Sequence, residues 1–195
     1  MPLQYLSEAD TRPDLVRVGV NEVLGRRSPL SGRGIAADQL QVELPHDIYD
    51  LRADKVAAGG GLDTAEKTGQ RYLVRAGAEP VAAGELVAGY GGEQMLANLN
   101  YGDFVSATAE AIDKLEAMDV VRNHQFEVRL LRFSSVYVMA IWLKSKEGQR
   151  DIIYPLPPTP RPIEAGHPYS PDEFVDLVRP LAKNRADEAT SLTVP

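Results

Sequence analysis

The chain has 195 residues, of which 44% are hydrophobic and 25% charged, a composition that fits one globular domain with at most a small addition. Asp and Glu (28) outnumber Lys and Arg (21), and the net charge of -7 disfavours a protein whose main task is to neutralise nucleic-acid phosphates. The lack of cysteine excludes disulfides, thiolate metal sites and a cysteine nucleophile.

Export and membrane signals are missing from the pattern of the chain. The first residues carry neither a basic start nor an apolar run of signal-peptide length. The longest apolar stretch, residues 136–143, is far too short to cross a bilayer. We therefore expect a cytoplasmic protein with neither a membrane nor a nucleic acid among its partners.

Residues 1–60 differ in pattern from the rest of the chain. Glycines and charged residues interrupt them, and a short apolar alternation over residues 40–44 is closed by Pro45. Three consecutive glycines at 59–61 then allow unrestricted backbone freedom, as in a linker or a loop tip. We expect a loop-rich N-terminal arm or subdomain over 1–60 and an α+β core domain over 61–195.

Two segments after these glycines are typical of strands that pair with each other. Residues 71–76 are rich in apolar and aromatic side chains, and residues 81–88 offer a partner, although Gly84 weakens the second strand. A helix over 103–119 follows, because its apolar positions recur at helical offsets and share one face. These positions are Phe104, Thr108, Ala111, Leu115 and Met118.

Three strong strands are predicted further along, over residues 125–133, 136–144 and 150–155. The first alternates apolar and polar side chains, which indicates one buried face. The second, which contains the lone tryptophan Trp142, is apolar on both faces and so belongs in the centre of the sheet. Because no helix interrupts the three strands, the fold class is α+β with an antiparallel sheet of three strands, or four or five with the earlier pair.

The C-terminal part begins with a proline-rich arm over residues 155–168. Seven of the 14 prolines of the chain fall between Pro155 and Pro171, a density that favours extended polyproline geometry. A helix over 171–187 is expected next. Ser170 is placed as its N-cap and Glu173 completes a capping box, so this helix should begin sharply and pack on the sheet.

Catalytic motifs do not stand out. The chain contains no phosphate-binding glycine loop, no G-x-S-x-G and no H-E-x-x-H, and its three histidines lack the spacing of metal ligands. We expect neither a cofactor nor a metal. The candidates for catalysis are His124, which a nearby carboxylate such as Asp119 can orient, and two strand tyrosines, Tyr137 and Tyr154.

Two function classes fit these patterns. The first is a non-catalytic protein-binding or assembly component that uses its N-terminal and proline-rich arms to contact a protein partner or further copies of the chain. The second is a small-molecule-binding protein or enzyme with a pocket at one end of a curved antiparallel sheet, lined by the histidine and tyrosine candidates. We favour the first class and an oligomer, because the sequence lacks catalytic motifs.

Overall fold

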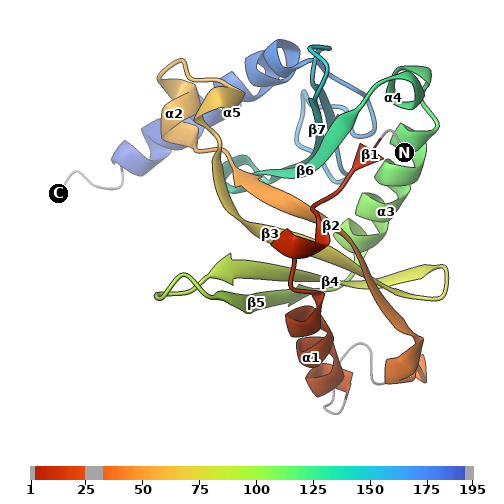
Figure 1. Ribbon diagram of the computed structural model, residues 1–195. Helices are drawn as coiled ribbons and strands as arrows, with labels where there is room; N and C mark the ends of the chain where they lie inside the picture. Colours follow the sequence, from red (N-terminus) through yellow and green to blue (C-terminus); the bar gives the residue numbers. More distant parts are fainter. Residues whose placement is uncertain (1–2, 25–32, 192–195) are drawn as a thin grey trace. The chain divides into compact units, whose positions relative to one another are not determined.

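A computed structural model describes residues 3–24 and 33–191 of the chain. Within these ranges the fold is α+β, with eight strands in one mixed sheet and five α-helices (Figure 1). The strands are β1 (Leu3–Gln4), β2 (Leu40–Asp50), β3 (Glu66–Ala76), β4 (Glu79–Ala88), β5 (Gln94–Asn100), β6 (Phe126–Phe133), β7 (Val138–Ser145) and β8 (Ile152–Pro155). The helices are α1 (Pro13–Leu24), α2 (Ala53–Ala57), α3 (Asp103–Glu116), α4 (Asp119–Asn123) and α5 (Pro171–Ser191).

The strand order is β5-β4-β3-β2-β6-β7-β8, and β1 pairs with β6. The expected α+β class is confirmed, but the sheet holds more strands than the three to five predicted. It is also not purely antiparallel, because β1 runs parallel to β6. A strand of two residues is too short to produce an alternation that a sequence pattern can reveal. None of the helices in the described ranges has the length and apolar character needed to cross a membrane.

The chain divides into two compact units. Unit 1 consists of Met1–Gln4, Ile48–Lys67 and Ala111–Pro195, and unit 2 consists of Tyr5–Asp47 and Thr68–Glu110. The expected arm over 1–60 and core over 61–195 stay a prediction. The first 60 residues nevertheless hold more regular structure than that prediction assumed, since α1, β2 and α2 all fall there.

The core of unit 1 is built on the antiparallel strands β6, β7 and β8. The predicted pairing is confirmed, with Arg129 opposite Trp142 and Trp142 opposite Ile153. β7 lies between two hydrogen-bonded neighbours and is buried on both faces along most of its length, with Trp142 only 5% exposed. Its apolar side chains on both faces explain this central position.

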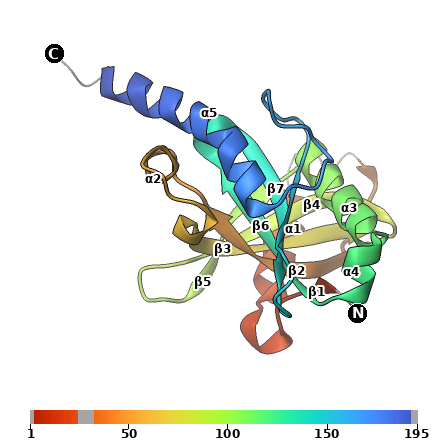
Figure 2. The same cartoon turned by 90° about the horizontal axis from the view of Figure 1, so that it is seen from above.

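Helices α2 and α5 cover one face of these strands and lie beside each other (Figures 1 and 2). The predicted capping box is confirmed, because Ser170 N donates to Glu173 Oε2 at 2.9 Å and Glu173 N donates to Ser170 Oγ at 3.4 Å. The helix extends to residue 191, beyond the expected end at 187. Pro180 lies inside it at an exposed position, where water can bond the carbonyl that the missing N–H leaves open.

Unit 2 is built on the antiparallel hairpins of β3, β4 and β5, with α1 packed against them. The predicted pairing of 71–76 with 81–88 is confirmed. Gly84, which weakened the strand in the sequence, is required by packing: a Cβ at this position would lie 2.5 Å from a Val16 methyl of α1. Val16 and Val20 are one helical turn apart and both fully buried, so they anchor α1 to the strands.

Two segments depart from the sequence expectations. β2 continues through Pro45 instead of ending there, because Leu44 adopts a φ of 52° that breaks the regular ladder at the proline. The helix expected over 103–119 ends at residue 116, where Met118 N–H bonds back to the Leu115 carbonyl at 3.1 Å. Met118 is then extended and serves as the N-cap residue of the separate helix α4.

Candidate functional site

The three candidate residues His124, Tyr137 and Tyr154 do not line a common cavity among those described. His124 follows α4, and its Nδ1 lies 3.4 Å from Oε2 of Glu147, whereas Asp119 pairs with Arg122 instead. Tyr154 is a buried residue of β8. Tyr137 alone faces a cavity, so the catalytic assignments of all three stay predictions.

Tyr137 lies in the turn that joins β6 to β7. The strand expected over 136–144 begins only at Val138, because residues 134–136 form a 3-10 turn closed by the Tyr137 N–H on the Ser134 carbonyl at 3.2 Å. Tyr137 itself has a φ of 58° and is 76% exposed. A bulky side chain in this left-handed conformation costs about 1–2 kcal/mol, so the turn holds an exposed aromatic ring at an energetic cost.

The cavity beside this ring, which we call the Tyr137 groove, has a volume of about 430 Å³. Three segments of unit 1 line it: the β6–β7 turn, the proline segment and the second half of α5. Val136 at its base is buried, while Tyr137 and Arg185 are exposed at its rim. The lining residues are Val136, Tyr137, Pro158, Thr159, Pro160, Leu181, Asn184 and Arg185.

The proline segment forms a fixed wall of this groove. It folds back on its own unit: Gly166 N–H bonds to the Pro155 carbonyl at 2.9 Å, and Tyr169 exchanges two backbone hydrogen bonds with Ile153. Ile163 is buried, and the Thr159 hydroxyl donates to its carbonyl at 2.8 Å. The prolines at 158 and 160 therefore present a rigid apolar surface with little conformational entropy left to lose.

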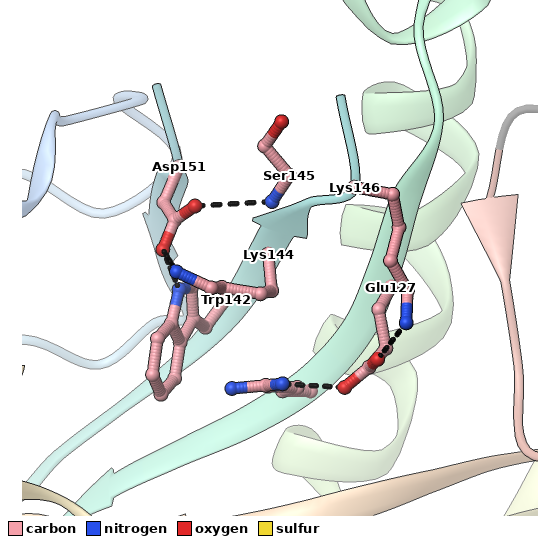
Figure 3. A network of polar contacts seen from close by, with 7 residues as sticks. Glu127, Trp142, Lys144, Ser145, Lys146 and Asp151 are labelled. Carbon is pink, nitrogen blue, oxygen red and sulfur yellow. Dashed lines mark hydrogen bonds and ion pairs between the residues drawn. The ribbon is translucent and has the colours of Figure 1, made fainter. Parts of the chain in front are cut away.

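Apart from the Tyr137 groove, a polar cluster lies on the β6–β7 surface (Figure 3). The Asp151 carboxylate accepts a hydrogen bond from Trp142 Nε1 at 2.9 Å, from Lys144 Nζ at 3.1 Å and from Ser145 N at 3.0 Å. This carboxylate thus ties the start of β8 to the end of β7 and satisfies the indole N–H of a nearly buried ring. Its bonds hold the sheet together, which is a structural role.

The same surface carries a guanidinium between two aromatic rings. The Arg129 guanidinium carbon lies 4.6 Å from the Tyr49 ring centroid and 4.8 Å from that of Trp142. Arg129 and Lys146 each contact Glu127 at 2.6 Å. Although partial burial opposes ionisation, these two cations hold the pKa of Glu127 below its usual value. Glu127 is therefore ionised at neutral pH and has no proton to donate as a general acid.

Two observations bear on acid–base and metal chemistry in the described residues. Four carboxylates with a resolved shift, Asp14, Asp54, Glu127 and Glu173, have a lowered pKa, whereas a catalytic acid needs a raised one. No cluster of three His, Asp or Glu residues with metal-binding geometry occurs in the described ranges.

Sequence reasoning missed the partners of Tyr137 and the burial of His46 in unit 2. Pro160, Leu181 and Arg185 join Tyr137 only through the packing of α5, which no local pattern reports. His46, one of the three histidines without metal-ligand spacing, is fully buried in β2. The chain matches no protein-family model, no curated protein and no solved structure, so the functional assignment depends on this geometry.

Proposed function

We propose that the chain is a non-catalytic protein-binding component, and that the Tyr137 groove docks an extended segment of a partner protein. The observation that carries this proposal is the strained, exposed Tyr137 at the rim of a hollow walled by prolines. Tyr and Arg are enriched among the residues that dominate binding energy at protein interfaces. In the Tyr137 groove, the Arg185 guanidinium lies over the ring of Tyr137.

The backbone at Tyr137 supports a role in binding over a role in folding. A glycine would adopt the same φ of 58° without strain, and an exposed tyrosine gains little from burial within its own chain. Strained residues of this kind gather at functional sites, where the surrounding structure holds them in place. The ring is thus available to pack against another molecule.

The walls of the groove suit an extended segment. The proline segment, α5 and the β6–β7 turn all contribute lining residues and are held by hydrogen bonds of their own, so the binding surface is largely formed before a partner arrives. In this proposal the proline-rich arm still takes part in binding, as the sequence leads us to expect, but in a different way. The arm contributes a wall of the groove and does not have to reach out to a partner.

A small-molecule site is the competing proposal, favoured by one observation. The groove volume of about 430 Å³ falls within the range of roughly 300–1,000 Å³ typical of ligand pockets. Against it, half of the eight lining residues are exposed and only Val136 is buried, whereas small ligands are usually largely enclosed. His124 and Tyr154, which the pocket hypothesis also required, do not line the groove.

Selection of a random peptide library on the full chain tests the proposal. We expect peptides that bind the wild type and lose about tenfold or more in affinity to Tyr137→Gly, a change of about 1.4 kcal/mol. The matched control is Tyr90→Gly, which removes a fully exposed tyrosine in unit 2 and should leave affinity unchanged. Failure to select any peptide, or selection of peptides indifferent to Tyr137, would contradict the proposal.

A further inference from the structure

In the part of the chain that the structure describes, the buried polar and charged residues are confined to unit 2. The buried side chains of unit 1 are apolar or aromatic. Burial of a polar group costs free energy that hydrogen bonds or an opposite charge must offset, so the interior of unit 2 carries costs that the interior of unit 1 avoids. The six buried polar residues are His46, Asp47, Gln70, Arg71, Glu85 and Thr108.

One cluster of buried apolar residues lies wholly within each unit. The cluster in unit 1 includes Trp142 and Phe174, and the cluster in unit 2 includes Val16 and Tyr72. Proteins open locally in contiguous units that differ in stability. A unit with an apolar cluster of its own can therefore open while the other unit stays folded.

His46 is a buried base in unit 2. Its side chain is 0% exposed, its Nδ1 lies 2.7 Å from the Leu44 carbonyl oxygen, and its Nε2 has no hydrogen-bond partner among the described residues. The bond to a carbonyl requires that Nδ1 carry the hydrogen, so a second proton would bind at Nε2. There it would place a positive charge in the interior with no acceptor to receive it.

The charge that acts on this imidazole has the wrong sign to stabilise a proton. Arg71, on the neighbouring strand β3, repels a positive charge at His46, and its own Nη1 lies 2.8 Å from Oε1 of Glu85 on β4. Asp47, the next residue of β2, acts on Tyr72 instead. Burial first and the Arg71 charge second hold the pKa of His46 at about 4.

The backbone beside His46 is strained. Leu44 has a φ of 52°, a left-handed conformation that is rare outside glycine, and Pro45 follows it inside β2. The Leu6 N–H bonds to the Pro45 carbonyl at 2.9 Å, which ties this kink to the first residues of unit 2. Opening of unit 2 releases the strain and so requires less free energy than opening of an unstrained unit.

From this placement we infer that unit 2 is acid-sensitive: in mild acid it opens before unit 1, and His46 couples the opening to proton uptake. When unit 2 is open, water reaches the imidazole, which is then protonated below pH 6.5; when unit 2 is closed, it stays neutral down to about pH 4. Acid therefore favours the open form. The Tyr137 groove lies in unit 1, so the inference is independent of the proposed function.

Amide hydrogen exchange of the full chain, measured residue by residue from about pH 7 to pH 4, tests the inference. Protection factors are compared, because they remove the direct effect of pH on exchange chemistry. We expect those of Leu73 and Ala82 in unit 2 to fall about a hundredfold, and those of Leu130 and Leu143 in unit 1 to fall about tenfold or less. The emission of Trp142, in unit 1, should stay unchanged over this range.

Two variants assign the effect to His46. His46→Leu removes the base that takes up the proton, and should reduce the fall of protection in unit 2 to about tenfold or less. The matched control is His167→Gln, which removes an exposed histidine of unit 1 and should leave the fall of about a hundredfold unchanged. The comparison of the two units in the wild type stands even where a variant does not fold.

Three results would overturn the inference. Parallel loss of protection in both units would show that the chain opens as one. Protection of unit 2 that survives at pH 4 would show that acid does not open it. A fall in His46→Leu as large as in the wild type would show that His46 does not couple opening to proton uptake.

Discussion

The guanidinium carbon of Arg185 lies 5.8 Å from the centroid of the Tyr137 ring. This contact connects α5 to the turn between β6 and β7, two segments far apart in the sequence. A cation over the face of an exposed tyrosine contributes roughly 0.5–1 kcal/mol. That amount is smaller than the cost of a left-handed tyrosine, so the contact alone does not explain why Tyr137 occupies the turn.

The first prediction concerns the strain at Tyr137. Tyr137→Gly should be about 1 kcal/mol more stable than Tyr137→Ala, because both remove the ring and only glycine adopts the φ of 58° without strain. Urea denaturation of the two variants gives this difference directly. If the alanine variant is the more stable one, the left-handed conformation of residue 137 is not present in solution.

Much of the core of unit 1 was predictable from the sequence. The apolar residues on both faces around Trp142 indicated a central strand, and β7 has that position. Ser170 and Glu173 marked the start of α5 correctly. Both signals are local, since alternation and capping depend on residues only a few positions apart.

The features that the sequence did not reveal depend on packing over long distances. Gly84 weakens the sequence prediction of a strand. In the fold, Val16 of α1 occupies the space that a side chain at this position would need. The predicted strand over 136–144 includes Tyr137, which instead lies in the turn before β7, because a positive φ at tyrosine has no sequence signature. The groove needs Arg185 and Pro160 as well, which only the folded α5 and the proline segment bring together.

The second prediction concerns Asp151, the carboxylate that bonds Trp142, Lys144 and Ser145. Asp151→Ala should cost about 2 kcal/mol or more, because it leaves the indole N–H and a backbone N–H without their acceptor. Emission of the lone tryptophan should shift to longer wavelength as water reaches the ring. Chemical denaturation followed by this emission measures both effects.

The control for Asp151 is Glu79→Ala, which breaks the exposed ion pair with Arg33. Exposed pairs of this kind contribute little, so we expect a change of about 0.5 kcal/mol or less. Equal effects of the two substitutions would show that the Asp151 bonds do not stabilise the sheet.

The third prediction concerns a buried ion pair in unit 2. Arg71 and Glu85 lie directly opposite each other on β3 and β4, with Arg71 Nη1 2.8 Å from Glu85 Oε1 and both side chains almost fully buried. Glu85→Gln should cost about 3–5 kcal/mol, because it removes the charge of a carboxylate that pairs with a buried guanidinium. The double variant Arg71→Met with Glu85→Leu should be markedly more stable than Glu85→Gln. A double variant as unstable as the single one would contradict this account.

The fourth prediction concerns pH and His46. Complete burial lowers the pKa of His46 from 6.5 to about 4. The 2.7 Å hydrogen bond between its Nδ1 and the Leu44 carbonyl opposes this shift, and the positive charge of Arg71 adds to it. In the unfolded chain the His46 imidazole is protonated as pH falls below 6.5. In the folded chain it stays neutral until about pH 4. The contribution of neutral His46 to the free energy of unfolding should therefore be fully present above pH 6.5. It should fall by about 3 kcal/mol as the pH is lowered to 4.

Comparison with His46→Leu isolates this contribution, because the carboxylates of the chain titrate in both proteins. The wild type should lose stability more steeply than the variant between pH 6.5 and about 4. The NMR resonance of the His46 ring should also stay unchanged above about pH 5. Parallel stability curves for the two proteins would contradict the neutral, buried state of this histidine.

Hydrogen–deuterium exchange of the full chain, with and without the tightest peptide selected from the library, tests the central claim most directly. We predict slower amide exchange in the β6–β7 turn, in the proline segment near Thr159 and in α5 around Leu181 and Arg185, and no slowing there when the chain carries Tyr137→Gly. Protection confined to other segments, or protection that survives in Tyr137→Gly, would contradict the assignment of the Tyr137 groove as the binding site.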